Sequence, residues 1–168
     1  FFDYFYQLFA QVTNPPIDAL RESFVTSTVL YLGNHGNLLE DSRAACRLVR
    51  LPGPLLTEED LARIASIDRV GFRVTRFRAT FERSAGAGAL EQALDELNSA
   101  VEAAVRAGTN IVILSDRAGA TEVPIPSLLA VASVHNHLMR AGVRTFADIV
   151  VESGDAISAH DLACLVAY

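Results

Sequence analysis

The sequence predicts an α/β fold in which βαβ units form a small parallel sheet, preceded by a helical N-terminal part. Two observations and one general rule support this prediction. Short apolar runs typical of strands occur at 72–80, 111–114 and 146–151. A helical pattern of apolar residues follows each run. Strands that alternate with helices in this way form right-handed parallel units.

The N-terminal part is predicted to contain two helices. Phenylalanines recur at spacings of three and four, which predicts a helix over residues 1–11. The proline pair at 15–16 ends this helix. A second helix is predicted over about 16–31, because proline is tolerated in a first turn and apolar residues continue along one face.

The middle of the chain shows less regular patterns. Glycine and asparagine residues at 33–37 predict a loop, and 38–56 is irregular apart from a short extended piece near 48–51. Thr57 is predicted to cap a short helix. Its hydroxyl can accept hydrogen bonds from backbone amides, and the acids at 58–60 favour the positive end of a helix dipole.

The pattern becomes regular from residue 72 onward. Leucines and valines at steps of three and four between 90 and 105 predict an amphipathic helix. The run 111–114 is continuously apolar, as in a strand that is buried on both faces. A helix over about 127–141 follows, and Ser158 is predicted to cap the last helix.

The composition restricts the functions that the chain can have. Its 168 residues are 51% hydrophobic, which suits one domain or most of one. All 14 basic residues are arginine, and the net charge of −6 predicts no nucleic-acid partner. The lack of lysine excludes Schiff-base and P-loop lysine chemistry. No stretch approaches the roughly 20 apolar residues that span a membrane, so no membrane association is predicted.

The cysteines indicate a cytoplasmic location. Cys46 and Cys164 are the only two, too few for a four-cysteine zinc site or an iron–sulfur cluster. Although one disulfide is arithmetically allowed, nothing else in the sequence points to a secreted scaffold. We therefore expect two reduced thiols.

Polar residues follow two of the predicted strands, where ligands bind in parallel α/β sheets. Asp116 and Arg117 follow one strand, and Glu152 and Asp155 follow the next. One hypothesis is a small independent α/β enzyme or metabolite-binding module that uses these four residues, with Asp116 and Glu152 as an acid–base pair. The alternative is ordinary loops in which the acids cap the following helix and Arg117 pairs with one of them.

The motif His135-Asn136-His137 is not predicted to bind a metal. Residues two apart on a helix point about 200° from each other, so their two rings cannot hold one ion. The surrounding helix is apolar nearly all round, which favours a buried His135 bonded to a carbonyl and His137 at an edge. Apart from the acid–base hypothesis for Asp116 and Glu152, no residue is predicted to be catalytic.

The segment from Thr13 to Asp18 has the most distinctive local chemistry. Its prolines donate no hydrogen bonds, and each restrains the residue before it to extended geometry. The carbonyls of Thr13 and Asn14 then lack helical partners and can accept from a small donor such as water or ammonia. A stiff connection between two helices is the alternative. The residues of this elbow are Thr13, Asn14, Pro15, Pro16, Ile17 and Asp18.

The elbow also belongs to a set of sequence blocks that resemble the large subunit of glutamate synthase. The blocks follow the family's order and span nearly the whole chain. They are Phe9–Asp18 with Arg21-Glu22, Gly36–Glu40, Leu55–Thr57, Ala79–Phe81, Ile113–Arg117, Pro124–Val131 and Val151–Gly154. The resemblance is to the central domain, which in this family joins the glutamine amidotransferase domain to the FMN-binding synthase domain.

This resemblance implies a fold and a role. The family's central domain is α/β and looks like a rudimentary or partial form of the (β/α) FMN barrel. The parent enzyme forms two glutamates from glutamine, 2-oxoglutarate and two electrons, using FMN and an iron–sulfur cluster. Ammonia passes inside the protein between its catalytic domains. The resemblance therefore implies a non-catalytic connecting domain whose Thr13–Asp18 elbow lines the beginning of the ammonia channel.

The resemblance also implies which partners the segment has. The amidotransferase cysteine, the cluster-binding cysteines and the flavin phosphate loops are missing, so no cofactor is expected in this segment itself. We expect it to be excised from a longer chain that carries the flanking amidotransferase and FMN domains. A sheet face meant for those neighbours would be exposed in the excised piece, which predicts a homodimer. The type of electron donor is not predicted.

Overall fold

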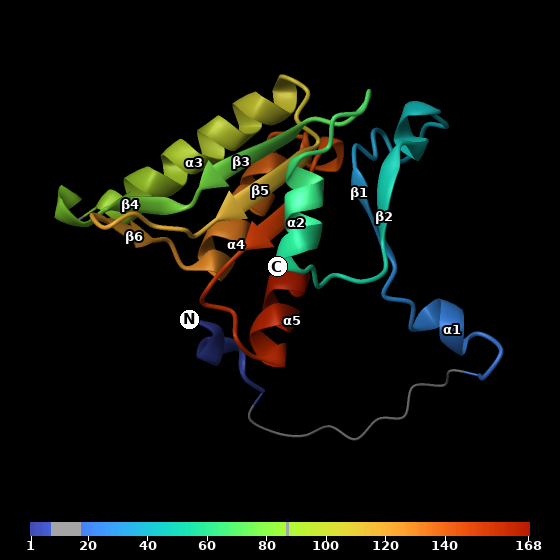
Figure 1. Cartoon of the computed structure of the whole chain (residues 1–168), viewed down its shortest axis with the longest axis horizontal. Coiled ribbons are helices and arrows are strands. Elements are labelled where there is room, and N and C mark those ends of the chain that lie inside the picture. The colour runs from blue at the N-terminus through green and yellow to red at the C-terminus, as the bar shows by residue number, and fades with distance from the viewer. Residues whose placement is uncertain (8–17, 87) are drawn as a thin grey trace.

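A three-stranded parallel sheet lies at the centre of the computed structural model, which describes residues 1–7, 18–86 and 88–168 (Figure 1). Its order is β3 (Val74–Arg78), β5 (Ile111–Ser115) and β7 (Asp148–Glu152). Helix α3 (Ala89–Arg106) connects β3 to β5, and α4 (Ser127–Arg140) connects β5 to β7. The parallel sheet in βαβ units is therefore confirmed.

Other elements surround this sheet. Two short antiparallel pairs flank it, β1 with β2 and β4 with β6. The bounds are η1 (Phe2–Phe5), α1 (Glu22–Val25), β1 (Leu30–Gly33), η2 (Ala44–Cys46), β2 (Leu48–Leu51), α2 (Glu58–Ala65), β4 (Thr80–Glu82), η3 (Arg83–Ala85), β6 (Glu122–Pro124), η4 (Arg144–Phe146) and α5 (Ala159–Ala167).

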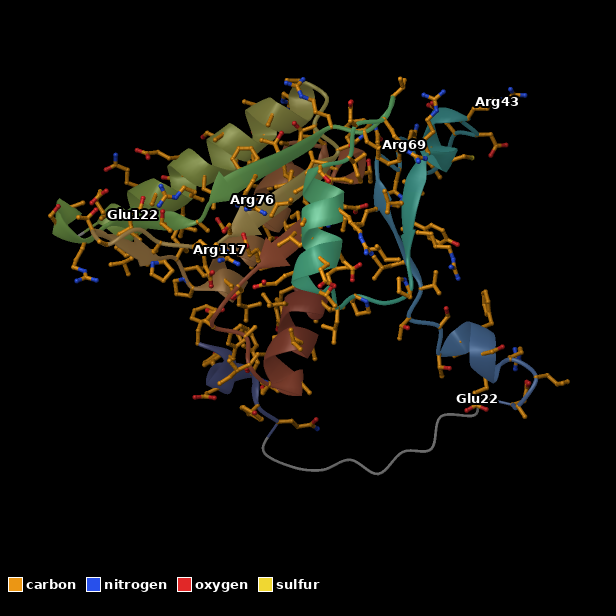
Figure 2. All side chains as sticks on the ribbon, viewed as in Figure 1. Glu22, Arg43, Arg69, Arg76, Arg117 and Glu122 are labelled. Atoms are coloured by element: carbon orange, nitrogen blue, oxygen red, sulfur yellow. The ribbon has the colours of Figure 1, made fainter. Side chains whose placement is uncertain are left out.

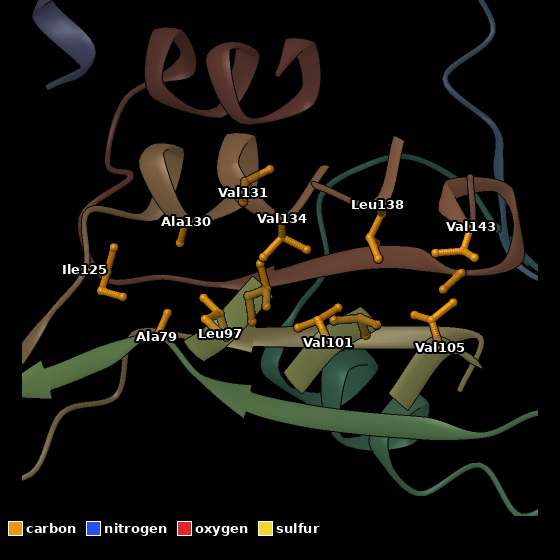
Figure 3. Packing of buried hydrophobic residues seen from close by; sticks show 13 residues of the cluster. Ala79, Leu97, Val101, Val105, Ile125, Ala130, Val131, Val134, Leu138 and Val143 are labelled. Atoms are coloured by element: carbon orange, nitrogen blue, oxygen red, sulfur yellow. The ribbon is translucent and has the colours of Figure 1, made fainter. Parts of the chain in front are cut away.

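One face of the sheet packs against α3 and α4. Val112 and Leu114 of β5 belong to a buried cluster with Val101 of α3 and Val134 of α4 (Figure 3). All five residues of β5 are buried, as expected for the middle strand of a sheet that is covered on both faces. The continuous apolar run of β5 thus reflects its central position.

The opposite face packs against α2 and the β1–β2 pair. Ile111 and Ile113 of β5 lie in a second buried cluster with Ile64 of α2 and Leu32 of β1. Asp148 fastens β1 to the beginning of β7. Its Oδ2 accepts from the Gly33 amide at 2.8 Å and lies 2.9 Å from Nε2 of His35. The fold therefore has three layers, with the sheet in the middle.

The predicted caps of two helices are confirmed. The Thr57 hydroxyl accepts from the Asp60 amide, and the Asp60 carboxylate accepts from the Thr57 amide in return. Ser158 and Asp161 form the same reciprocal arrangement at the start of α5. Each capping box satisfies amide groups that have no partner inside the helix.

The prediction of a helical N-terminal part is wrong for the described residues. Residues 2–5 form one 3-10 turn, and the predicted helix over 16–31 is reduced to α1, followed by strand β1. The aromatic spacing instead reflects packing, since Phe2 is buried against Leu128 and Cys164. Residues 25–30 are rich in β-branched side chains, which favour extended backbone.

The C-terminal end of β3 also differs from the predicted strand over 72–80. The parallel strand stops at Arg78, and Thr80 begins β4, which pairs with β6 in antiparallel fashion. The described residues form an open sheet of three parallel strands and show no barrel closure. Within the described ranges, no helix is both long and apolar enough to cross a membrane.

Candidate functional site

The four strand-end residues predicted from the sequence lie together at the carboxyl edge of the sheet. Asp116 and Arg117 directly follow β5, Glu152 is the last residue of β7, and Asp155 lies in the loop before α5. Because β5 and β7 are parallel neighbours with Ser115 opposite Glu152, their ends meet. Figure 2 shows Arg117 and Arg76 in this region.

Glu152 is the centre of an ion-pair cluster. Its Oε1 accepts from Nε of Arg117 at 2.5 Å, and its Oε2 lies 3.7 Å from Nη1 of Arg76 on β3. Arg117 also lies 3.5 Å from Glu58 at the start of α2. The Glu152 side chain is 11% exposed and that of Arg117 66%. A nearly buried carboxylate thus holds one arginine from β3 and one from the loop after β5.

The electrostatics keep this cluster ionised. Burial raises the pKa of Glu152, but the Ser115 hydroxyl and the arginines Arg117 and Arg76 outweigh it, so the pKa lies below its ordinary value. The hydrogen bond and charge of Glu152 raise the pKa of Arg117. A carboxylate that stays charged near neutral pH has no proton to donate, so Glu152 is not suited to general-acid catalysis.

The Asp116 carboxylate is hydrogen-bonded to the loop after β7. Its Oδ2 accepts from the Ser153 hydroxyl at 3.0 Å and from the Gly154 amide at 2.6 Å. These bonds fix the loop after β7 to the loop after β5. Asp116 and Glu152 therefore each bind their own partners, and the hypothesis that they act as an acid–base pair stays a prediction.

Asp155 caps α4. Helix α4 begins after Pro126, which provides no side-chain cap, and Asp155 accepts instead from the Ser127 amide at 3.2 Å and the Ser127 hydroxyl at 2.5 Å. Burial raises the pKa of Asp155, but its hydrogen bonds with Ser127 and Ser153 lower it further than burial raises it. The expectation that these acids cap the following helix is wrong for Asp155, because Ser158 already caps α5.

Arg76, Arg78 and Glu58 belong to this edge but were not predicted from the sequence. Arg78 pairs with Glu122 of β6, whose carboxylate also accepts from the Gly119 amide. Alternate positions on a strand share one face, so the spacing of Arg76 and Arg78 on β3 was a usable signal. Glu58 could not be found in this way, because its partner Arg117 is far from it in sequence and follows β5 rather than β3.

An apolar groove of about 930 Å³ lies beside the carboxyl edge. Its walls come from β7, α5 and the β1–β2 pair, and it is lined by leucines such as Leu30, Leu51 and Leu162. Asp116 and Arg117 line it where it meets the carboxyl edge of the sheet, and Arg144 and His135 also line it. It is the place near the edge where a further group of atoms could fit.

The histidine motif contacts neighbouring side chains. Nδ1 of His135 accepts from Nε of Arg144 at 3.0 Å, so the predicted bond to a carbonyl is wrong. Burial and the Arg144 charge lower the pKa of His135. Nε2 of His137 lies 2.6 Å from Glu102 on α3. No cluster of three or more potential metal ligands occurs in the described part of the chain.

The two cysteines are free thiols in different parts of the fold. Cys46 is exposed, and His35, its neighbour in sequence, pairs with Asp148 instead. Cys164 is buried with its Sγ 3.5 Å from Nε2 of His160, a contact that their spacing of four on α5 could have revealed. His160 also faces the Phe2 carbonyl at 3.1 Å and therefore helps to hold η1.

Most of the elbow lies outside the described residues, which resume at Asp18. Asp18 accepts from the amides of Leu20 and Arg21 and from Nε of Arg21 at 2.8 Å. The Arg21 hydrogen bonds lower the pKa of Asp18. Asp18 thus fixes the turn that leads into α1, whereas the expectations for Thr13, Asn14, Pro15, Pro16 and Ile17 stay untested.

Comparison with known proteins gives consistent matches along the chain. Residues 1–168 match the family described as the glutamate synthase central domain. The chain belongs to this family. It is 41% identical to the glutamate synthase [NADPH] large chain of Bacillus subtilis over 99% of its length. It is 39% identical to glutamate synthase [NADH] of Schizosaccharomyces pombe and 40% identical to the chloroplastic ferredoxin-dependent glutamate synthase of Spinacia oleracea, each again over 99%.

The glutamate synthase central domain is a small part of these relatives. The chain spans 11% of the Bacillus protein, 8% of the Schizosaccharomyces protein and 10% of the Spinacia protein. The relatives are therefore much longer polypeptides with domains beside this one. Their names include NADH, NADPH and ferredoxin, so membership of the central domain family does not fix the electron donor.

Proposed function

We propose that this glutamate synthase central domain is a non-catalytic connector between a glutamine amidotransferase domain and an FMN-binding synthase domain of the same polypeptide. Membership of the family and the small share of each relative that the chain spans support this role. The main observation in support of the non-catalytic role is that the acidic side chains at the carboxyl edge of the sheet are already paired. There Asp116, Glu152 and Asp155 all bind groups of the chain itself.

The second part of the proposal is that the Thr13–Asp18 elbow lines the beginning of a channel for ammonia. The support is chemical. Two consecutive prolines leave neighbouring carbonyls without helical donors, and such carbonyls accept hydrogen bonds from ammonia. The last residue of the elbow, Asp18, is fixed in place, because its carboxylate accepts hydrogen bonds from the turn before α1.

The parent reaction is the formation of two glutamates from glutamine, 2-oxoglutarate and two electrons. FMN and an iron–sulfur cluster belong to other parts of the parent chain in this proposal. The residues of the segment fit neither group. Its two cysteines lie apart, one exposed and one buried, and the polar groups at the carboxyl edge are engaged with one another. A cytoplasmic location completes the proposal.

The channel is tested by replacing Pro15 and Pro16 with alanine in the full-length enzyme. Glutamine hydrolysed and glutamate formed are measured together, because a channel that leaks ammonia separates the two rates. We expect hydrolysis to continue while glutamate formed per glutamine hydrolysed falls severalfold. The matched control replaces Pro52 and Pro124, which are exposed and lie in other parts of the fold. An unchanged ratio in the elbow variant contradicts the channel but leaves the connecting role intact.

The independent module that uses Asp116, Arg117, Glu152 and Asp155 makes a different prediction. It requires the 168-residue segment to bind a metabolite that carries a phosphate or a carboxylate. Calorimetry with FMN, glutamine and 2-oxoglutarate separates the two functions, and the connector predicts no binding heat from any of the three. Saturable heat that disappears in an Arg117→Gln variant supports the independent module instead.

A further inference from the structure

The N-terminal turn η1 lies beside α5, where His160 holds it in two ways (Figure 1). Nε2 of His160 lies 3.1 Å from the Phe2 carbonyl oxygen, and Nε2 carries the hydrogen because a carbonyl oxygen only accepts. The imidazole also stacks on the ring of Tyr6, with the ring centroids 3.8 Å apart and the planes inclined at 17°. One side chain thus contacts both ends of the turn, since Phe2 begins η1 and Tyr6 directly follows it.

His160 is itself fixed in place at the start of α5. It lies in the first helical turn, between Ser158 and Asp161, which form the capping box. The buried Asp161 carboxylate accepts from the amides of Ile157 and Ser158 at 3.1 and 2.8 Å. Reciprocal caps of this kind define the path of the backbone into a helix. The imidazole is therefore presented to η1 from a well-anchored turn.

The turn η1 depends on side-chain contacts for its position. It is one 3-10 turn, and the hydrogen bonds that the Tyr4 and Tyr6 amides donate at its ends are both 3.3 Å long. A single turn of this kind has little stability of its own. The rings of Phe2 and Phe5 pack against the domain, but apolar contacts have no preferred direction. The hydrogen bond and the stacked ring of His160 are directional, so they set the orientation of the turn.

The turn is also the last described element before the elbow. Thr13 is seven residues after Tyr6, and a chain of that length spans at most about 25 Å. On the other side of the elbow, residues 18–28 are all exposed. Within the described ranges, their first hydrogen bond to another part of the fold is donated by the Thr28 hydroxyl to the Pro52 carbonyl, ten residues beyond the elbow. The position of the elbow relative to the sheet is therefore controlled more closely from the η1 side.

We propose that His160 is a positioning residue for the Thr13–Asp18 elbow. By holding the Phe2 carbonyl and the Tyr6 ring, it directs the chain that enters the elbow and keeps the elbow carbonyls where they accept from ammonia. His160 acts through the backbone of η1 and not on ammonia itself. This inference rests on the proposed channel and adds to it a residue that is distant from the elbow in sequence.

The test changes the two sides of this contact separately in the full-length enzyme. His160→Ala removes both the donor and the stacked ring, whereas His160→Gln keeps a side-chain N–H donor. Tyr6→Ala removes the stacking alone and leaves the core intact, because Tyr6 is 50% exposed. The matched control is His137→Ala on α4, where another partly exposed histidine is bonded to Glu102 of α3 instead of to η1.

Two quantities are measured for each variant. Glutamate formed per glutamine hydrolysed reports on the channel, and hydrogen exchange of the peptide that covers Phe2–Tyr6 reports on the turn. We expect His160→Ala to lower the ratio severalfold and to speed exchange about tenfold, since a hydrogen bond and a ring contact together shift the opening of the turn by about that factor. Tyr6→Ala and His160→Gln should have smaller effects in the same direction, and His137→Ala should change neither quantity. A general loss of stability would instead lower both reactions together and leave the ratio unchanged.

Unchanged exchange in both His160→Ala and Tyr6→Ala overturns the inference, because the contact then does not hold the turn. A ratio for His160→Gln as low as that for His160→Ala overturns the role given to the hydrogen bond. Faster exchange with an unchanged ratio overturns the positioning role, and the Pro15 and Pro16 variant then shows which claim has failed. If that variant lowers the ratio, the channel stands and only the role of His160 is wrong. If it leaves the ratio unchanged as well, the proposed channel is wrong.

Discussion

Arg117 donates from Nε to Oε1 of Glu152 at 2.5 Å and so joins the loop after β5 to the last residue of β7. Arg76 approaches the other carboxylate oxygen from β3. The cluster links all three parallel strands at the edge where such sheets often bind ligands. In this domain the edge is thus held together by its own charges.

Replacing Glu152 with glutamine should destabilise the domain. The change leaves two arginines without their shared negative charge, and we expect a loss of about 1–2 kcal/mol in the free energy of unfolding. Urea unfolding of the 168-residue segment, followed by circular dichroism, measures it. The control is Glu58→Gln. Glu58 is 93% exposed, and its pair with Arg117 should be worth less than about 0.5 kcal/mol. Equal effects of the two variants would contradict the central role of Glu152.

Replacing Asp155 with asparagine should weaken the start of α4. The variant loses a negative charge beside the first amide groups of the helix, and a lost cap costs about 1 kcal/mol. Asp155 has a lowered pKa, so its contribution is present above the ordinary aspartate pKa and is lost as the pH falls through the folded value. The midpoint of thermal unfolding at pH 7 measures the effect. Asp95→Asn, an exposed acid on α3, should leave it almost unchanged.

His135 should make the stability depend on pH in a defined direction. Burial and Arg144 lower its pKa, so the unfolded chain takes up a proton more readily than the folded one. Stability is then fully present above the unfolded pKa of about 6.5 and is lost as the pH falls through the folded pKa. A His135→Gln variant should lose less stability than the parent between those pH values. An NMR titration that places the His135 pKa at or above its ordinary value would disprove this explanation.

Gly33 should be much less tolerant of alanine than Gly142. Both have positive φ, but a Cβ at Gly33 would lie 2.9 Å from Cδ2 of Leu48 and 3.2 Å from the Arg47 carbonyl oxygen. A Cβ at Gly142 would meet nothing within 4 Å. We expect Gly33→Ala to cost about 2–3 kcal/mol, from strain and crowding together, and Gly142→Ala about 1 kcal/mol. The two unfolding curves are compared directly, and similar shifts would show that crowding by β2 is unimportant.

The sequence by itself determined the elements that depend on local interactions. The helix pattern over 90–105 became α3, the apolar run at 111–114 became β5, and the caps Thr57 and Ser158 lie where they were predicted. Helix periodicity and capping involve residues at most four apart, so they are visible in a linear sequence. The blocks that resemble glutamate synthase likewise identified the family.

Only the tertiary structure decided which distant residues meet. It made residues 30–33 a strand by pairing them with β2, although the sequence predicted a helix as far as about residue 31 and a loop from residue 33. It also brought Asp155 to the start of α4, where it accepts from Ser127, 28 residues away in sequence. In the same way it brought Arg76 and Arg117 to Glu152. The packing of η1 on α5 and the groove beside β7 have the same origin. They depend on how elements that are separate in the sequence pack together, and the propensity of a single segment does not predict this packing.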